Sequence, residues 1–534
     1  MKRRDFIKDI AVVGSVLGTG LQGLHANAPS KPDTASGGNI RPNILFVMTD
    51  QQRYDALGCH GGPAVTPNLD RLAASGADLQ AFFTQAPVCV PSRQNLFTGR
   101  ARMARRGETF LLQPHEIHLY RTLKENGYYL GYTGKNHLLE HHEFENFDRH
   151  QINELKPGTD KDAAERRRYK DAQAASRYLL NSKGSWASGI FFDGAPEATD
   201  TYLDRAFAVD FIRNAPAERP FCLTVSFNDP HVPHVAPAKF RDMYPLASIR
   251  LPDVPEGTLD QKQRRYRIKR EGQCMDNASA DDKRHYLAVY YAMVSWIDEN
   301  VGAILDALQE SGRAGNTIIV FTSDHGDFAC EYDMVKKDLV LPDSLIHVPC
   351  LVSWPGVINP QSVDKTMADQ IDIMPTLLDY CGIPAPIGVQ GKSLKPLLEG
   401  KTTTHKDEIY AEVCQPVDIN TYPNYAAYVR DLERYGKTPG HRVSFAAPYN
   451  IPGEYNRCLR TKEWKYIWYN SEFEELYDLV NDPRELHNLA TNPAHQQRCR
   501  EMKDKLWTYG QTYSDYRTVG ERLAVTSQYP KWKS

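Results

Sequence analysis

Four short apolar segments separated by helical patterns constrain the fold of this 534-residue chain more than any other feature. The segments are rich in Ile, Leu, Val and Phe, which is typical of strands buried on both faces of a parallel sheet. They are residues 43–49, 220–227, 317–322 and 348–353. Helical patterns lie between them at residues 67–74, 116–126, 202–214 and 281–311. This alternation predicts an α/β fold with a mostly parallel central sheet covered by helices on both faces.

The last part of the chain has a different pattern. Short apolar segments with turns between them occupy residues 408–412, 457–460, 464–469 and 476–479, and a helical pattern follows at 493–513. This order predicts a small antiparallel sheet with one helix. We therefore expect a main domain over residues 43–400 and a smaller C-terminal subdomain over residues 401–534.

The N-terminus has the pattern of an export signal. Lys2, Arg3 and Arg4 precede a mildly apolar stretch at residues 10–24 and an A-x-A pattern at residues 26–28. This predicts a signal peptide over residues 1–28, followed by a Pro/Ser/Gly linker over residues 29–42. The paired arginines resemble a twin-arginine signal, so we expect a periplasmic or secreted bacterial protein. We expect no membrane span, because no later segment has 18 or more consecutive apolar residues.

The charge balance limits the possible partners. The chain has 64 Lys and Arg against 67 Asp and Glu, a formal net charge of −3. A protein that coats nucleic acid needs a net basic surface, so no nucleic-acid partner is expected. The ten cysteines are widely spaced and form no C-x-x-C pair, so they predict no disulfide framework.

Polar residues follow two of the predicted strands. Asp50 and Gln51 come directly after the segment 43–49, and Asp324 and His325 come after the segment 317–322. In open α/β sheets, ligands bind beyond the carboxyl ends of the strands. We therefore expect the active site at this edge of the sheet.

The most informative motif is C-V-P-S-R from Cys89 to Arg93, followed by Thr98-Gly99-Arg100. Pro91 favours the start of a helix, so we expect residue 89 at a helix N-terminus, where unpaired N–H groups favour an anionic group. Arg93, one turn further, is expected to point its guanidinium at the same place. The whole string resembles the signature of the type I sulfatases, C-x-P-S-R followed by T-G-R, in the alkaline phosphatase superfamily.

The resemblance implies that a maturation enzyme oxidises Cys89 to Cα-formylglycine, which hydrates to a gem-diol. One hydroxyl would attack sulfur to form a covalent sulfate ester, and proton loss from the second would expel sulfate. It also implies an alkaline-phosphatase-like fold and one divalent metal per chain, Ca²⁺ or another ion. The implied ligands are Asp50, Gln51, Asp324 and His325. Two features depart from the calcium site that the resemblance implies: many relatives have Asp where Gln51 stands, and His325 supplies nitrogen to what would otherwise be an oxygen site.

Three further motifs resemble the family. Gly134-Lys135-Asn136-His137 is similar to its second signature, which implies that Lys135 and His137 together bind the sulfate and take the gem-diol proton. Pro230-His231-Val232-Pro233 matches P-H-x-P, whose histidine protonates the leaving group. Lys336, eight residues before Ser344, has the spacing of the second lysine of the family, with the adjacent Lys337 as the alternative.

Two basic runs, at residues 165–170 and 262–270, are expected in loop insertions where they could steer a polyanion. Residues 422–455 are rich in Tyr, Asn and Arg, a composition that can stack on sugar rings. Together with export, these features favour a sulfated polysaccharide or oligosaccharide as substrate over a small aryl ester. Two other functions stay open: a phosphodiesterase or phosphonate monoester hydrolase of the same superfamily, and a catalytically idle glycan-binding protein. The complete set of Cys, Lys and His residues favours sulfate-ester hydrolysis.

Overall fold

The computed structural model describes residues 41–101, 111–112, 116–152, 163–178, 185–415, 454–469 and 473–512. The expected signal peptide and nearly all of the linker lie outside these residues, as does almost all of the Tyr-rich segment 422–455. The described residues belong to one compact unit. None of the described helices combines the length and apolar character that a membrane crossing requires.

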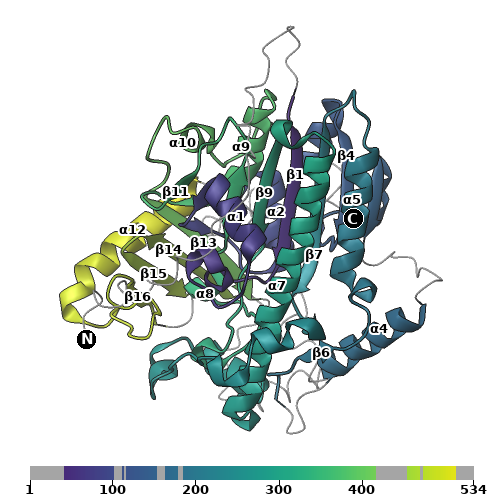
Figure 1. Ribbon diagram of the computed structural model, residues 1–534. Helices are drawn as coiled ribbons and strands as arrows, with labels where there is room; N and C mark the ends of the chain where they lie inside the picture. Colours follow the sequence, from purple (N-terminus) through teal and green to yellow (C-terminus); the bar gives the residue numbers. More distant parts are fainter. Residues whose placement is uncertain are drawn as a thin grey trace, which may run out of the picture. The chain divides into compact units, whose positions relative to one another are not determined.

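An eight-stranded sheet in the order β11-β2-β10-β9-β1-β7-β4-β5 forms the centre of this unit (Figure 1). Its strands are β1 (Asn43–Asp50), β2 (Ala77–Leu79), β4 (Tyr129–Gly134), β5 (Arg149–Ile152), β7 (Phe221–Pro230), β9 (Thr317–Ser323), β10 (Cys350–Ser353) and β11 (Gln361–Val363). β1 pairs in parallel with β7 and β9, and β4 pairs in parallel with β7 and β5. The predicted mostly parallel α/β sheet is therefore confirmed.

The strand β10 differs from the expectation of a parallel strand, because it runs antiparallel to its neighbours β9 and β2. A parallel neighbour needs a long crossover, usually through a helix, to return the chain to the other end of the sheet. Between β9 and β10 the chain forms only a 3-10 turn (Glu331–Asp333), the four-residue helix α8 (Asp343–Ile346) and loops. The chain therefore re-enters the sheet from the end at which it left.

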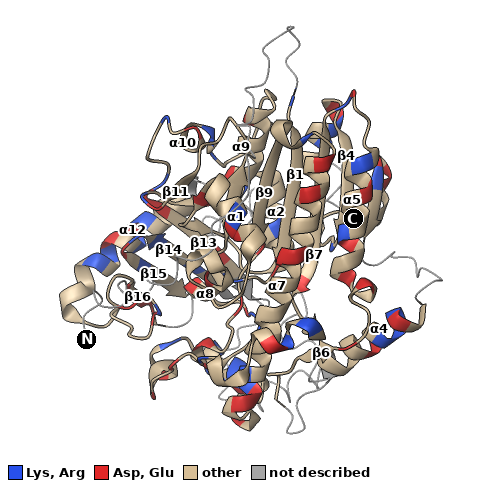
Figure 2. Cartoon of the chain, viewed as in Figure 1, with Lys and Arg blue, Asp and Glu red and all other residues tan. Residues whose placement is uncertain are grey.

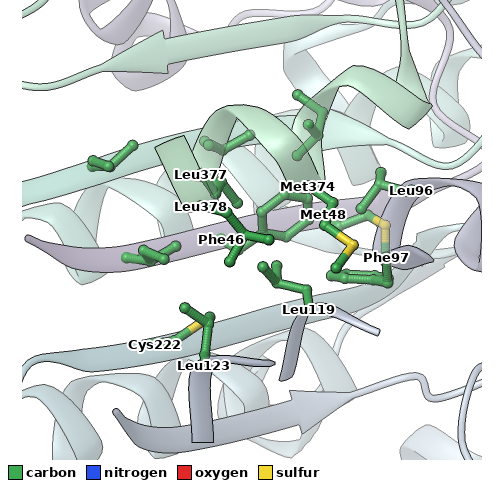
Figure 3. Packing of buried hydrophobic residues seen from close by; sticks show 14 of the residues in the cluster. Phe46, Met48, Leu96, Phe97, Leu119, Leu123, Cys222, Met374, Leu377 and Leu378 are labelled. Atoms are coloured by element: carbon green, nitrogen blue, oxygen red, sulfur yellow. The ribbon is translucent and has the colours of Figure 1, made fainter. Parts of the chain in front are cut away.

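Each face of the sheet carries its own hydrophobic core, because side chains alternate along β1. Ile44, Phe46 and Met48 pack with residues of α2 (Cys89–Thr98), α3 (Leu119–Glu125) and α9 (Ile373–Tyr380), as Figure 3 shows for Met374, Leu377 and Leu378. Leu45 and Val47 pack on the opposite face. Their partners there belong to α1 (Pro67–Ser75), α5 (Asp200–Asn214) and α7 (Ala280–Glu310).

The C-terminal part has the predicted small antiparallel sheet. Its strands, in spatial order, are β13 (Glu408–Gln415), β14 (Glu454–Thr461), β15 (Trp464–Tyr469) and β16 (Glu475–Asp478). The helix α12 (Gln496–Thr512) contributes Met502 and Leu506 to a core with Leu459 and Leu476 of this sheet. The remaining strands and α-helices of the described residues are β3 (Phe82–Phe83), β6 (Ile190–Phe192), β8 (Val235–Pro237), β12 (Ala368–Asp369), α4 (Ala163–Tyr178), α6 (Arg264–Gly272) and α10 (Lys395–Leu398).

The two basic runs lie mainly on the helices α4 and α6, so the expectation of loop insertions is wrong. Acidic partners accompany the basic residues, and Figure 2 shows both signs of charge along α4. Arg168 lies 2.6 Å from Glu165, and on α6 the buried Arg265 lies 2.6 Å from Asp338. These pairs weaken the positive field that the sequence alone suggests.

Candidate active site

The carboxyl ends of β1 and β9 and the first turn of α2 meet at one edge of the central sheet. Asp50 is the last residue of β1, and Asp324 and His325 directly follow β9, its parallel neighbour. The Cys89 Sγ lies 3.7 Å from Asp50 Oδ1 and 3.4 Å from His325 Nε2. One potential ligand atom from each of Asp50, Cys89, Asp324 and His325 falls within 4.8 Å of the others, and all four residues are buried. The fold thus brings Cys89 next to a histidine that lies 236 positions away in the sequence.

The helix α2 begins at Cys89, as the position of Pro91 predicts. Val88 before it is extended, and the helix ends at Gly99, which has a φ of 62° and donates its N–H to the Asn95 carbonyl at 3.0 Å. A residue with a Cβ is disfavoured in this left-handed conformation, which accounts for the glycine of the motif. Cys89 therefore stands in the first turn, where backbone N–H groups have no partner within the helix.

Arg93 is fully buried and joins the two carboxylates. Its Nε donates to Asp324 Oδ2 and its Nη2 to Asp50 Oδ2, both at 3.0 Å, while Nη1 donates to Ser226 Oγ at 2.8 Å. The guanidinium thus fixes the spacing of Asp50 and Asp324. We expected the Arg93 guanidinium to point at residue 89. In the structure it bridges the carboxylates of Asp50 and Asp324 instead.

Lys135 enters the site from the end of β4. Its Nζ lies 2.6 Å from Asp50 Oδ2 and 3.7 Å from Cys89 Sγ. Gly134 before it has a φ of 99°, and a Cβ at that position would lie 2.0 Å from the Ser226 carbonyl oxygen. This close approach of β4 to β7 requires glycine and directs the next side chain toward Cys89.

Lys337, rather than the predicted Lys336, is the second lysine beside the cysteine. The Lys337 Nζ lies 3.0 Å from Cys89 Sγ and 3.1 Å from Gln51 Oε1. The Lys336 Nζ instead lies 4.0 Å from the centre of the Trp186 ring. Lys336 has a positive φ of 65°, so the backbone turns at this residue, and sequence spacing could not tell which of the two side chains faces Cys89.

The two predicted histidines have different surroundings. His231 Nδ1 lies 2.6 Å from the Val232 carbonyl oxygen, which favours a proton on Nδ1, and its Nε2 lies 3.9 Å from Asp50 Oδ1. His137 follows Lys135 by two residues, and its Nδ1 is buried without a hydrogen-bond partner. Within the described part of the chain no hydrogen bond joins His137 to Cys89. The structure therefore brings His231 to the cluster.

Two further polar residues support the cluster, and neither was predicted. Asp327 accepts a hydrogen bond from Gln51 Nε2 at 2.5 Å. Gln370 donates to the carbonyl oxygens of Ser323 and Asp324 at 3.0 and 2.9 Å. Its Oε1 accepts from Ser92 Oγ at 2.8 Å. Asp327 could have been suspected from its position three residues after Asp324, whereas the sequence around Gln370 carries no such signal.

The charges of the cluster act strongly on its titratable groups. Burial would raise the pKa of the Cys89 thiol, yet the ammonium groups of Lys135 and Lys337 hold that pKa well below its usual value. Burial opposes the charged form of Asp50 as well, but Lys135 and His231 keep its pKa well below the usual range. Burial raises the pKa of Asp324 to about 6, and the adjacent Asp50 carboxylate adds to the effect. The site therefore favours negative charge at Cys89 and Asp50.

The donor set fits a divalent cation. Two buried carboxylates and the His325 imidazole converge, and Gln51 Oε1 shares the Lys337 ammonium with Cys89. Burial and the Asp50 carboxylate both raise the pKa of Asp324, and a cation shared by the two carboxylates would offset both effects. Carboxylate and amide oxygens suit Ca²⁺, whereas the imidazole nitrogen also suits transition metals.

Comparison with known proteins identifies the family. A family model described as Sulfatase matches residues 42–383. This chain belongs to the sulfatase family. A second model, described as N-sulphoglucosamine sulphohydrolase, C-terminal, matches residues 445–512 of the sulfatase. Together with the relatives described next, this makes the protein a sulfuric ester hydrolase.

Relatives and solved structures agree with this assignment. The sulfatase is 27% identical to an arylsulfatase of Clostridium perfringens, covering 87% of this chain and 93% of the relative. It is 25% identical to an N-acetylglucosamine-6-O-sulfatase of Bacteroides thetaiotaomicron, with coverages of 91% and 88%. Its fold matches a 2-O GAG sulfatase at a TM-score of 0.65 and 23% identity, covering 90% and 94% of the two chains. It also matches a phosphonate monoester hydrolase of Silicibacter pomeroyi at a TM-score of 0.69 and 20% identity, covering 89% and 96%. The fold is therefore alkaline-phosphatase-like.

Proposed function

We propose that this sulfatase hydrolyses sulfate esters of extracytoplasmic polysaccharides or oligosaccharides, using a formylglycine at position 89 and one divalent metal, with Ca²⁺ as the first choice. The observation that carries the proposal is the surrounding of Cys89, which stands at the start of α2 within reach of Lys135, Lys337 and His325. Names of relatives support the substrate class, because one is an N-acetylglucosamine-6-O-sulfatase and a structural neighbour is a 2-O GAG sulfatase.

The residues of the site suit the binding of a sulfate group. Formylglycine, once formed and hydrated, would supply a hydroxyl nucleophile that displaces the alcohol from sulfur and a second hydroxyl whose loss of a proton would expel sulfate. Lys135 and Lys337 offer ammonium groups to the anionic sulfate oxygens, on the same side as Cys89. Asp50, Gln51, Asp324 and His325 are the residues that would hold the metal, which supplies Lewis-acid stabilisation of the developing charge.

His231 is suited to protonate the leaving oxygen of the substrate. Burial, with the nearby charges of Lys135 and Lys337, lowers the pKa of His231 well below its usual value. A bound sulfate ester adds negative charge beside these ammonium groups and so offsets their effect on His231. Protonation of Nε2 is therefore coupled to substrate binding, while Nδ1 stays on the Val232 carbonyl.

The predicted export signal implies that maturation precedes or accompanies export, so we propose a formylglycine-forming enzyme in the producing cell as a partner. Mass spectrometry of the protein from a host with such an enzyme is expected to show aldehyde in place of thiol at residue 89. A panel of sulfated glycans, with nitrophenyl sulfate, a phosphate diester and a phosphonate monoester as controls, tests the reaction class. Preference for a phosphorus ester would favour phosphonate monoester hydrolysis, to which the fold likeness at a TM-score of 0.69 points. Binding of glycans with no turnover by the matured protein would show an idle binding protein.

A further inference from the structure

Asp327 lies beside the cluster, where it accepts a hydrogen bond from Gln51, and further donors surround its carboxylate. Its side chain is fully buried. Oδ1 accepts the N–H groups of Ala329 and Lys336 at 2.6 and 3.1 Å and the Tyr286 hydroxyl at 3.2 Å. Oδ2 accepts from Gln51 Nε2 at 2.5 Å. Such an arrangement of donors requires a group that only accepts, which an ionised carboxylate is.

Asp327 decides which end of the Gln51 amide faces the site. The amide lies between two unlike partners, because Lys337 Nζ can only donate and the Asp327 carboxylate can only accept. Only one orientation satisfies both, with Nε2 toward Asp327 and Oε1 toward Lys337 and Cys89. The reverse orientation would turn N–H groups toward an ammonium and away from the carboxylate. The chemistry of the neighbours therefore fixes the orientation.

The same carboxylate also holds the backbone that carries Lys337. It accepts a hydrogen bond from the backbone N–H of Lys336. The φ of Lys336 is 65°, in the left-handed region that residues other than glycine rarely adopt. The Lys336 carbonyl in turn accepts from the Phe328 N–H at 2.7 Å. These hydrogen bonds fix a turn at which the two adjacent lysine side chains diverge. The Lys337 side chain reaches Cys89, and the Lys336 ammonium lies over the Trp186 ring.

We propose that Asp327 is a positioning residue, which turns the Gln51 amide oxygen toward the metal position and fixes the turn that brings Lys337 to Cys89. The inference rests on the proposed function, because the metal belongs to it. Partners behind metal ligands fix the orientation of those ligands, and their loss usually costs about 10- to 100-fold in metal affinity.

A double-mutant cycle that interchanges carboxylate and amide tests the proposal. In Asp327→Asn, the NH₂ of the new amide faces either the N–H groups of Ala329 and Lys336 or the Nε2 group of Gln51. In both orientations a hydrogen-bond donor therefore faces another donor. In Gln51→Glu, two carboxylates face each other. The double variant restores a complementary pair with the total charge unchanged, because the amide of residue 327 donates to the carboxylate of residue 51. Asp333→Asn, in the same loop, is the matched control.

Two measurements are made on the metal-free proteins, isothermal titration with Ca²⁺ and with Mn²⁺, and thermal unfolding. We expect Asp327→Asn to bind the preferred ion about 10- to 100-fold more weakly than the wild type. The double variant is expected to recover most of this affinity and to unfold at a higher temperature than either single variant. The control Asp333→Asn is expected to bind the ion as the wild type does. Affinity of Asp327→Asn within about twofold of the wild type, or a double variant no better than the single ones in both measurements, would overturn the proposal.

The cycle also separates failure of this inference from failure of the proposed function. If the wild type binds neither ion, the metal is removed from the proposed function, and the unfolding cycle alone decides whether Asp327 orients Gln51. If Asp327→Asn yields no folded protein, recovery of folding on addition of Gln51→Glu supports the proposal, and continued failure to fold counts against it.

Discussion

Lys336 and Lys337 are adjacent and chemically identical, but only Lys337 has its ammonium group against Cys89. Removing a charge aimed at the transition state typically costs about 10²- to 10³-fold in kcat. We expect Lys337→Ala to lose activity on nitrophenyl sulfate on that scale, and Lys336→Ala, the matched control, to stay within a few fold of the wild type. Steady-state kinetics of both variants measure the difference. Equal losses, or a larger loss for Lys336→Ala, would contradict the placement of the two lysines.

The contribution of His231 to the rate is expected to depend on the leaving group of the substrate. A general acid contributes more as the departing oxygen becomes more basic, so an alcohol of a sugar needs it more than nitrophenol does. We expect His231→Ala to lower kcat/KM for a sulfated sugar by about 10²- to 10⁴-fold and to affect nitrophenyl sulfate far less. Comparison of the two substrates with the same enzyme preparations provides the measurement. A similar loss on both substrates would assign His231 to binding instead.

At the scale of elements, Gln370 joins α2 to the end of β9. It lies in the turn before α9, is fully buried, and bonds to the carbonyl groups of Ser323 and Asp324 and to the Ser92 hydroxyl. Gln370→Leu removes these hydrogen bonds between buried groups, at a cost of about 1–3 kcal/mol in the free energy of unfolding. The change is measured by urea denaturation against Gln309→Leu, an exposed position near the end of α7. Equal stability of the two variants would show that Gln370 does not hold these elements together.

At the scale of the whole molecule, the basic run on α6 has both a structural and an exposed part. Arg265 is buried against Asp338, whereas Arg267 pairs with Asp260 at 2.9 Å on the surface. Removing one partner of a buried ion pair costs about 3–5 kcal/mol, and an exposed pair contributes about 0–1 kcal/mol. We therefore expect Arg265→Ala to lower the free energy of unfolding strongly and Arg267→Ala to leave it nearly unchanged, as measured by urea denaturation.

Arg267 is consequently the residue of this run with which to test glycan steering. Screening acts on exposed charges over about 8–10 Å at physiological ionic strength. If the run guides a polymeric substrate, Arg267→Ala should raise KM for a sulfated polysaccharide and flatten its salt dependence, with nitrophenyl sulfate unaffected. Unchanged glycan kinetics would show that the basic residues of α6 form a solvated helix face with no role in substrate binding. A loss of stability in Arg267→Ala equal to that in Arg265→Ala would contradict the structural distinction between them.

The sequence by itself determined most of the elements and the edge of the sheet at which the candidate site lies. Apolar periodicity acts over a few residues through backbone geometry, so the strands β1, β7, β9 and β15 and the helices α1, α5 and α7 lie close to where the pattern predicts them. Because parallel strands end at the same edge of a sheet, the residues after β1 and β9 could be expected to meet. The motif that starts at Cys89 also predicted the helix start that α2 has.

Only the tertiary structure decided which side chains become partners. The hydrogen bond between Gln51 and Asp327 joins residues 276 positions apart, and the pair of Arg265 with Asp338 spans 73 positions. The antiparallel direction of β10 depends on the route of a long loop, and the choice of Lys337 over Lys336 depends on one residue with a positive φ. Local patterns cannot carry this information, because burial and partner chemistry arise only after distant segments have packed together.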